Sequence, residues 1–225
     1  MAPGLQFLFS FAHRSISDQI RGCMEIAQHG EERFYDGLPS VTTVLDVINE
    51  PHLARWRGRI GNEEADRITN EAAWIGDLVH DVLSAVELTG ANLEEYQNPA
   101  IIHPIGAYIE WKRQTLDRWL MIEEALISKE HGFGGRIDRV GMLKGDSLPS
   151  IVDLKSGRPS IKHKFQTAGY KLLLKSNGVV VGRRLCLYLP TTEEKGSKVT
   201  VKEFTNPNDE AGFLYCLKLW NIIKE

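Results

Sequence analysis

The sequence contains two short stretches in which an acidic residue interrupts an apolar, β-branched run: GRIDRV at residues 135–140 and IVDLKSG at residues 151–157. A carboxylate inside such a strand is costly unless it is paired or binds a metal ion. Because side chains alternate along a strand with a period of two, Asp153 and Lys155 lie on the same face. A hairpin that joins the two strands brings Asp138 beside that face. The two stretches therefore predict a small sheet that carries clustered acids next to a lysine.

Clustered carboxylate oxygens of this kind suit Mg²⁺ or Mn²⁺, which prefer carboxylate, carbonyl and water ligands. Glu123, in the strand expected just before residue 135, can add a third carboxylate. Such ions activate water and stabilise the charge on a phosphodiester under in-line attack. Lys155 can orient the attacking water or offset that charge. A lone Asp-x-Lys is also a common surface ion pair, so it is the joint occurrence with Asp138, a hairpin away, that favours a metal site.

Polar residues in two expected helices accompany these stretches. Gln166 and Tyr170 are four residues apart and therefore share one helix face. They either bond a water, the lysine or a phosphate, or are simply polar residues at the edge of the core. His80 lies within an otherwise apolar helical face, so it is either a core histidine or the imidazole placed to reach the sheet as a metal ligand.

The surrounding hydrophobic pattern predicts a mixed α/β domain with a small central sheet. Before the strands, Ser40 or Thr42 can cap a short helix, and residues 33–35 form a strand that enters an Asp-Gly turn. The expected helices cover residues 62–89, about 98–119, 161–176 and 207–225. The expected strands cover residues 120–128, 135–143, 150–155, 184–189 and 198–204, and the alternation of Phe7, Phe9 and Phe11 allows one more.

Composition limits the function classes without choosing among them. With 225 residues, 42% hydrophobic and 25% charged, the chain is expected to form one large domain, or one domain with a helical insertion. A net charge of −3 argues against a passive basic coat on nucleic acid, but it leaves a nuclease or a partner-binding module open. Cys23, Cys186 and Cys216 form neither a disulfide framework nor a CxxC metal motif, which suits a reducing compartment.

Five motifs in chain order resemble the RecB-type branch of the PD-(D/E)XK nuclease superfamily. They are Gly76 to His80, Glu123, Gly135-Arg-Ile-Asp138, Asp153-Leu-Lys155 and Gln166-x-x-x-Tyr170. Residues 39–45 and 53–56 resemble the opening of the mitochondrial genome maintenance exonuclease and related phage and bacterial exonucleases. The resemblance implies a restriction-endonuclease-like α-β-β-β-α-β core with an N-terminal helical arch or cap. We expect an N-terminal extension over residues 1–38 and a single nuclease domain over residues 39–225, with its helical region at 45–119.

The same resemblance implies roles for individual residues. The implied ligands of one or two Mg²⁺ or Mn²⁺ ions are His80, Glu123, Asp138, Asp153 and the backbone carbonyl of Leu154. The implied catalytic residues are Lys155, Asp138, Asp153, Glu123, Gln166 and Tyr170. Spacing favours Glu123, although the alternation of the strand leaves open whether Glu123 or Glu124 faces inward. Several relatives carry a four-cysteine iron–sulfur cluster, and we expect none here because three widely spaced cysteines cannot form it.

Basic and aromatic residues suggest where DNA would bind. A single-strand track needs cations for phosphates and a ring for base stacking, and a helix N-terminus can accept a phosphate. The candidates are Arg55, Trp56 and Arg57; Lys162 and Lys164 at a helix start; Arg136 and Arg139 beside Asp138; and Ser40 and Thr42 in the opening motif. Each cluster is also compatible with a solvated face. Since no base-reading code is present, we expect little sequence specificity.

The sequence thus predicts a metal-dependent DNA exonuclease, acting on single-stranded or end-bearing DNA in replication, recombination or repair. A duplex-end or structure-selective nuclease and a catalytically silent DNA-binding module are the alternatives. DNA is the expected partner, with a recombination or replication protein as a second. No membrane is expected, because the apolar run at residues 7–9 is far shorter than a span. The lack of a transit-like leader favours a bacterial or phage protein in the cytoplasm over a mitochondrial one.

Overall fold

The computed structural model describes residues 24–29, 32–93, 96, 98–191 and 198–225. Its centre is a five-stranded sheet in the order β4-β5-β6-β7-β8. The first three strands form an antiparallel meander, β7 runs parallel to β6, and β8 is antiparallel to β7. The strands are β4 (Leu116–Ser128), β5 (Phe133–Leu143), β6 (Ser150–Lys155), β7 (Arg183–Tyr188) and β8 (Thr200–Glu203).

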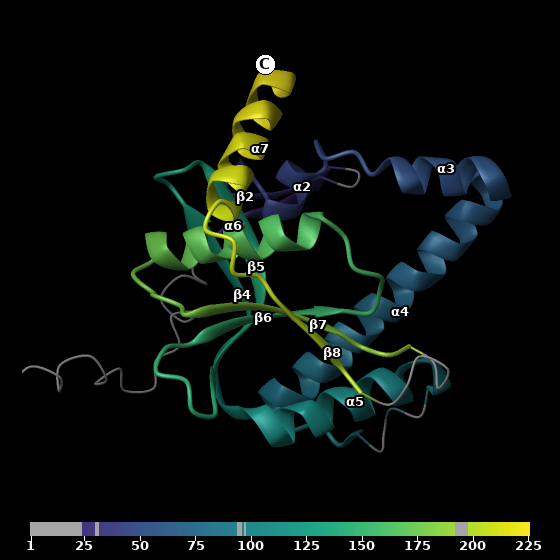
Figure 1. Ribbon diagram of the computed structural model, residues 1–225, viewed down its shortest axis with the longest axis vertical. Coiled ribbons are helices and arrows are strands. Elements are labelled where there is room, and N and C mark those ends of the chain that lie inside the picture. Colours follow the sequence, from purple (N-terminus) through teal and green to yellow (C-terminus); the bar gives the residue numbers. More distant parts are fainter. Residues whose placement is uncertain (1–23, 30–31, 94–95, 97, 192–197) are drawn as a thin grey trace, which may run out of the picture.

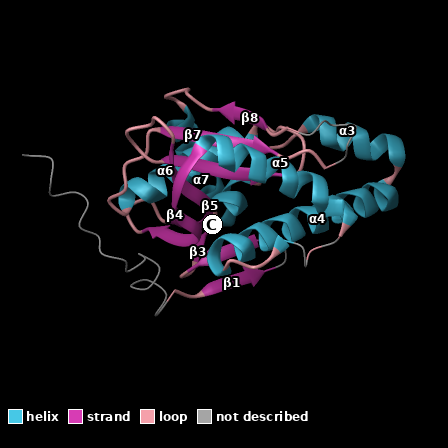
Figure 2. Cartoon of the chain, turned by 90° about the horizontal axis from the view of Figure 1, so that it is seen from below, coloured by secondary structure: helices cyan, strands magenta, loops and turns pink. Residues whose placement is uncertain are grey.

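Helices cover both faces of this sheet, as Figures 1 and 2 show. On one face lie α2 (Val41–Leu45), α6 (Lys162–Ser176) and α7 (Asp209–Lys224). On the other face lie α4 (Asn62–Thr89) and α5 (Pro99–Thr115). Each face has its own apolar cluster, centred on residues such as Leu173 and Phe213 on the first face and Val82 and Tyr108 on the second. The two clusters bury apolar side chains on both faces of the sheet, as the hydrophobic effect favours.

Helix α6 connects the parallel strands β6 and β7, because parallel neighbours need a long crossover. It ends at Asn177, whose backbone N–H bonds the carbonyls of the last turn, and Gly178 follows with φ at 78°. That left-handed residue is the stop signal that the sequence predicts at Asn177-Gly178. The crossover places the start of α6 directly above the end of β6, where the motif IVDLKSG lies.

A second, small sheet of β1 (Ile26–His29), β2 (Glu32–Tyr35) and β3 (Leu38–Pro39) packs beside β5. The Asp36-Gly37 turn joins β2 to β3, and both residues have positive φ, at 50° and 75°. This is the hairpin turn that the sequence predicts for Asp-Gly. Tyr35 lies so close to Gly134 that a Cβ on the glycine would come within 2.6 Å of the Tyr35 Cβ. The small sheet therefore sits tightly against the strand that carries GRIDRV.

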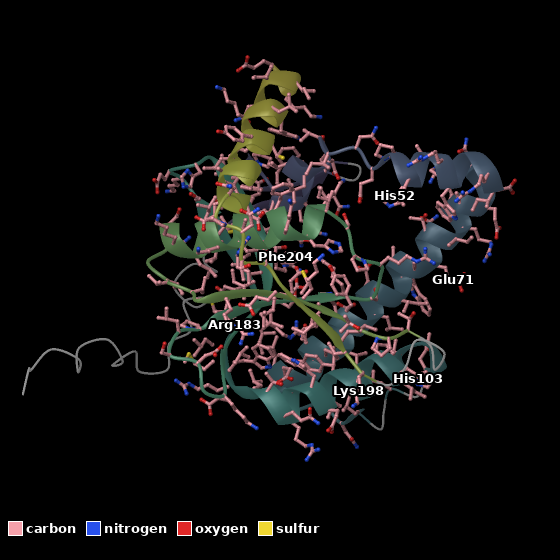
Figure 3. The ribbon with its side chains drawn as sticks, viewed as in Figure 1. His52, Glu71, His103, Arg183, Lys198 and Phe204 are labelled. Carbon is pink, nitrogen blue, oxygen red and sulfur yellow. The ribbon has the colours of Figure 1, made fainter. Side chains whose placement is uncertain are left out.

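Helix α4 spans the 28 residues that the 3.6-residue periodicity predicts, and it ends at Gly90 with φ at 70°. Its second half packs on the sheet through Val79, Val82 and Leu83, which are buried. Its first half and α3 (Pro51–Ile60) project away from the sheet in Figure 1. In Figure 3, His52 and Glu71 mark these two projecting arms. The part of residues 45–119 that could act as an arch is therefore α3 and the start of α4, whereas α5 belongs to the core.

The α-β-β-β-α-β order expected from the sequence is present, and the restriction-endonuclease-like fold class is confirmed. The helix expected over 98–119 ends at Thr115, because Leu116 already has extended backbone and begins β4. Phe7, Phe9, Phe11 and Cys23 lie outside the described residues. Within the described part of the chain, no helix has both the length and the apolar character needed to cross a bilayer.

Candidate active site

The site forms where β5 and β6 separate. The two strands pair only through Arg139–Gly141 and Ser150–Val152. Beyond these pairs, the backbone N–H of Leu154 donates to Oδ2 of Asp138 over 2.9 Å. This bond spans the widening gap and holds the Asp138 carboxylate at the mouth of the opening between the strands. Because β5 and β6 no longer pair beyond this point, polar side chains from neighbouring elements can enter between them.

Three potential metal ligands meet at this opening: His80 from α4, Glu123 from β4 and Asp138 from β5. One ligand atom from each can be chosen so that all lie within 4.8 Å of one another. Nε2 of His80 lies 3.8 Å from Oδ2 of Asp138 and 3.3 Å from the carbonyl oxygen of Leu154. Nδ1 of His80 lies 3.5 Å from Oε1 of Glu123. The sequence-predicted ligands His80, Glu123, Asp138 and Leu154 therefore come together.

This donor set fits a divalent cation. Two ligands of one ion at about 2.1 Å lie roughly 3 to 4.2 Å apart in an octahedral arrangement, and the His80, Asp138 and Leu154 distances fall in that range. Two carboxylates, a carbonyl and an imidazole supply negative charge and hard oxygen ligands.

The backbone of Glu123 explains why this residue, and not Glu124, faces the site. Glu123 has φ at 51°, a left-handed value that non-glycine residues seldom adopt inside a strand. The turn in the backbone breaks the simple alternation of side chains along β4. Glu123 consequently lines the cavity, whereas Glu124 is buried elsewhere. Alternation alone could not have made this choice.

A second group lies next to the metal ligands and contains the predicted lysine. Nζ of Lys155 lies 2.9 Å from Oδ2 of the fully buried Asp153. Nε2 of Gln166 donates to Oδ1 of Asp153 over 3.1 Å, and it also lies 2.9 Å from the hydroxyl of Tyr170. The thiol of Cys186 donates to Oδ2 of Asp153 over 3.3 Å. Asp153 is thus surrounded by protein partners and is not part of the three-residue group that could hold a metal ion among the described residues.

Electrostatics differ between the two groups. Burial alone would lower the pKa of His80, but the charges of Asp138 and Glu123 outweigh it and raise that pKa to about 9. Burial raises the pKa of Asp153 to about 6, although Lys155 opposes the shift. Burial would lower the pKa of Lys155, but Asp153 and Asp138 raise it above its ordinary value. The lysine therefore carries its positive charge at neutral pH.

The three potential metal ligands line one cavity of about 560 Å³ together with Lys155, Gln166 and Tyr170, whereas Asp153 is buried behind it. It is a polar cavity that receives side chains from both sheets and from α4 and α6. Its walls include residues that sequence inspection did not select as site residues: Arg33, Tyr35, Asp77, Asp81 and Ser84. Arg33 and Tyr35 come from β2, so the small sheet forms one wall of the site. No motif in residues 24–38 marks this role, because it depends on how the hairpin packs against Gly134.

The candidate DNA contacts are spread over the molecule. Ser40, Thr42 and Arg136 line the cavity, and Ser40 also caps α2 by accepting a bond from the Thr43 N–H over 3.0 Å. Arg139 has no exposed surface, so the expectation that it contacts DNA is wrong. Its side chain is instead drawn inward to Glu123.

The remaining candidates lie on helix surfaces. Arg55, Trp56 and Arg57 lie on α3, which buries none of its residues, and Arg57 pairs with Asp66. Lys162 pairs with Asp46 over 3.0 Å, and Nζ of Lys164 lies 4.6 Å from the ring centre of Phe165. These lysines therefore have partners within the protein that a phosphate would have to compete with.

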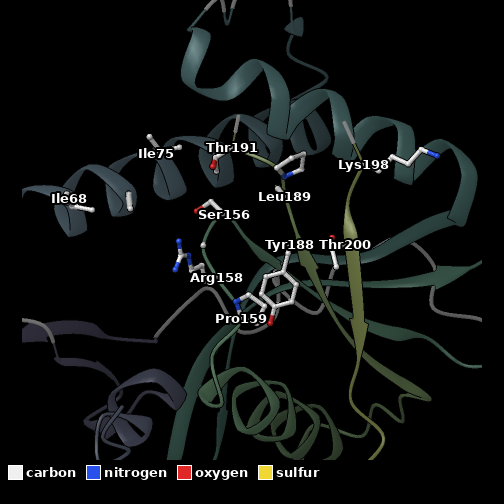
Figure 4. A pocket seen from close by; sticks show the side chains of 13 residues that line it. Ile68, Ile75, Ser156, Arg158, Pro159, Tyr188, Leu189, Thr191, Lys198 and Thr200 are labelled. Carbon is white, nitrogen blue, oxygen red and sulfur yellow. The ribbon is translucent and has the colours of Figure 1, made fainter. Parts of the chain in front are cut away.

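A second cavity of about 480 Å³ lies between α4 and the segment that follows β6 (Figure 4). Ile68 and Ile75 line it from the helix, and Arg158 and Tyr188 line it from the sheet side. Between the two cavities α4 touches the loop after β6, since a Cβ on Gly76 would come within 2.9 Å of the Ser156 hydroxyl oxygen. The end of β6 therefore borders both spaces.

A sequence profile of the PD-(D/E)XK nuclease superfamily matches residues 52–215, which include all five motifs of the site. The chain belongs to the PD-(D/E)XK nuclease superfamily. Membership in this nuclease superfamily, whose enzymes use divalent metals and act on DNA, makes His80, Glu123 and Asp138 the candidate metal centre of a nuclease.

Comparisons with individual proteins add less. No curated protein matches the chain in sequence. One similar solved structure, "Crystal structure of SSO0001", is 16% identical with a TM-score of 0.41. The alignment covers 81% of this chain and 75% of that one.

Proposed function

We propose that this nuclease is a metal-dependent DNA exonuclease of the RecB-type branch, which hydrolyses phosphodiesters in single-stranded or end-bearing DNA during replication, recombination or repair. The observation that carries the proposal is the meeting of His80, Glu123 and Asp138 beside the Lys155 ammonium group in one open cavity. A cavity with ligands for a cation and a separate fixed positive charge suits a substrate that carries phosphate.

The chemistry follows from the two groups. His80, Glu123 and Asp138 would hold a divalent ion, which would supply a Lewis acid for a phosphate oxygen and would lower the pKa of a water molecule. Lys155 reaches the cavity with one fifth of its side chain exposed, and Asp153 fixes its position. Its ammonium group orients the attacking water or neutralises charge that develops on the phosphate oxygens. Gln166 keeps Asp153 in place, so that Lys155 needs no rearrangement when substrate arrives.

Mg²⁺ or Mn²⁺ is the proposed ion, because two carboxylates and a carbonyl are hard oxygen ligands. The single imidazole of His80 makes the site more tolerant of Mn²⁺, which accepts nitrogen ligands more readily than Mg²⁺ does. We therefore expect activity with both ions, and Mn²⁺ is the better probe for binding measurements.

Helix α3 and the first half of α4, which project away from the central sheet, support a preference for DNA with a free end. Helix α3 exposes Arg55 and holds Trp56 and Arg57 half-buried on its surface, which are the residue types that bind a single strand by charge and stacking. The second cavity adds Arg158 and the ring of Tyr188 near the end of β6. A strand that runs along these surfaces to the metal centre is more easily accommodated when it has a free end.

The test uses the purified protein with Mg²⁺ or Mn²⁺ on linear single-stranded, linear blunt duplex and closed-circular single-stranded DNA of one length. We expect the linear single strand to be degraded fastest and the circle to stay intact. Asp138→Asn should abolish degradation, whereas the exposed Asp117→Asn on the same sheet should not. Cutting of the circle would replace the exonuclease proposal with an endonuclease, and preference for the duplex would support a duplex-end enzyme.

Equal activity of the wild type and Asp138→Asn would instead indicate a silent DNA-binding module. The proposed cellular setting is a bacterial or phage cytoplasm, with a recombination or replication protein as the proposed partner. Pull-down of such a protein with the Asp138→Asn variant, which we expect to hold DNA without cutting it, is the corresponding experiment.

A further inference from the structure

Arg139 is the largest side chain in the described residues that is fully buried. Its guanidinium group is charged at every accessible pH. A buried charge is strongly destabilising unless nearby groups compensate it. Arg139 contacts the candidate metal ligand Glu123, and the partners of its guanidinium group indicate what this charge does.

The buried charge of Arg139 is compensated mainly by residues at or next to the candidate metal centre. Nη1 lies 3.4 Å from Oε1 of Glu123, and Nη2 donates to the hydroxyl of Ser84 over 3.2 Å. The guanidinium carbon lies 5.8 Å from the ring centre of Tyr108, a cation–π distance. Nε has no hydrogen-bond partner among the described residues. Glu123 is thus the only carboxylate in ion-pair contact with Arg139 within the described part of the chain.

The contacts of Glu123 converge on one of its two oxygens. Oε1 lies 3.5 Å from Nδ1 of His80, 3.3 Å from the Ser84 hydroxyl and 3.4 Å from Nη1 of Arg139. Three donors saturate the lone pairs of one carboxylate oxygen. The second oxygen, Oε2, is therefore the one that remains available to a cation.

The backbone conformation of Glu123 is an independent indication that its side chain must be held in place by neighbouring residues. A non-glycine residue with φ at 51° inside a strand is strained, and such strain persists only where the surroundings enforce it. Arg139 and Ser84 hold the end of the side chain whose backbone is strained. Without them, Glu123 could relax to the ordinary strand conformation and leave the cavity.

We propose that Arg139 is a positioning residue for the metal centre: it pins Oε1 of Glu123, with Ser84, so that Oε2 faces the ion. The inference rests on the proposed function and names a residue that acts through Glu123 and touches neither substrate nor ion. Arginine suits this role because its planar fork reaches Glu123 and Ser84 together, which a lysine cannot do.

The test measures Mn²⁺ affinity of the metal-stripped protein by electron paramagnetic resonance of the free ion. The main variant is Arg139→Lys, because it keeps the positive charge and removes only the two-point contact. We expect Mn²⁺ to bind about 10-fold more weakly, the lower end of what loss of a partner of a metal ligand costs. In a Glu123→Gln background, the same substitution should change affinity less than about twofold, because the residue through which it acts is gone.

The matched control is Arg184→Lys, since Arg184 is also buried and pairs with Asp209 over 2.7 Å, on another part of the sheet. It should lower the melting temperature without weakening Mn²⁺ binding. If Arg139→Lys fails to fold, Ser84→Ala removes the shared hydroxyl and should weaken Mn²⁺ binding several-fold. A stable Arg139→Lys or Ser84→Ala protein with wild-type Mn²⁺ affinity would overturn the inference and leave the nuclease proposal standing. A wild type that neither binds Mn²⁺ nor degrades DNA would overturn both.

Discussion

The site has two halves that are built in opposite ways. The metal half consists of His80, Glu123 and Asp138, and the lysine half consists of Asp153, Lys155, Gln166 and Tyr170. Side-chain distances within the metal half are 3.5 to 3.8 Å, and its two acids share one opening. Those within the lysine half are 2.9 to 3.1 Å and are largely buried. The protein alone completes the lysine half, whereas the metal half needs a cation to complete it.

Asp138→Asn should have the largest effect, because it removes a charge from the half that must attract the ion. Asparagine still accepts the bond from the Leu154 N–H, so the fold should remain. We expect nuclease activity to fall about 10³-fold or more, since metal assistance supplies several kcal/mol to such a reaction. A DNA degradation assay at saturating Mn²⁺ measures it, and activity above a tenth of the wild type would contradict the assignment.

Lys155→Gln should show that the lysine half contributes to the reaction without holding the ion. Glutamine keeps a donor for the buried Asp153 and loses the positive charge that we propose acts on the phosphate. Activity should fall about 10²-fold, as for removal of one stabilising donor. Mn²⁺ affinity, measured by titration of the metal-stripped protein, should stay within about threefold. A parallel loss of affinity would mean that the two halves do not act separately.

Metal binding should depend on pH through the metal half. The pKa of His80 is raised to about 9, so below that pH an ion must displace a proton from the imidazole. Apparent Mn²⁺ affinity should therefore rise with pH, by up to about tenfold per unit, and level off above about 9. Calorimetry at pH 6.5, 7.5 and 8.5 in buffers of different ionisation heat measures the proton released. A plateau that begins near pH 6.5 would indicate an unperturbed histidine.

Gln166→Ala should act on stability, because the lysine half is part of the folded core. The variant leaves Oδ1 of the buried Asp153 without the donor it has in the wild type. An unsatisfied buried group of this kind costs about 1–3 kcal/mol of unfolding free energy. Urea unfolding measures it, with the exposed Gln114→Ala as a control that should change by less than about 0.5 kcal/mol. Mn²⁺ affinity should remain unchanged in both variants.

The elements that sequence inspection predicts well are those with strong local signals. The periodicity of residues 62–89 and the stop at Gly90 match α4 closely, and the Asp36-Gly37 turn is where the sequence expects it. The boundary between α5 and β4 lies four residues earlier than the hydrophobic pattern predicts. Leu116 and Trp119 are apolar residues that suit either element, and no glycine or proline separates them.

The parts of the site that sequence inspection missed depend on tertiary structure. Arginine is seldom buried, so Arg139 beside an acid suggests a phosphate contact until its burial is known. The choice between Glu123 and Glu124 depends on a left-handed backbone value that no local sequence signal marks. The wall formed by Arg33 and Tyr35 depends on where the small sheet docks. Residue types and spacing thus predict the ligands, and packing supplies what orients them.

Two adjacent glycines have a consequence of their own. A Cβ on Gly134 would collide with Tyr35, and one on Gly135 would press within 3.2 Å of both Leu173 and Val41. Neither glycine has chemistry to offer, yet any side chain at Gly134 would push the β2–β3 hairpin off the central strand, and one at Gly135 would crowd α2 and α6. In a saturation-mutagenesis selection for nuclease activity, Gly134 should be as intolerant as an acidic ligand and Gly135 should be restricted to small residues, although neither handles substrate.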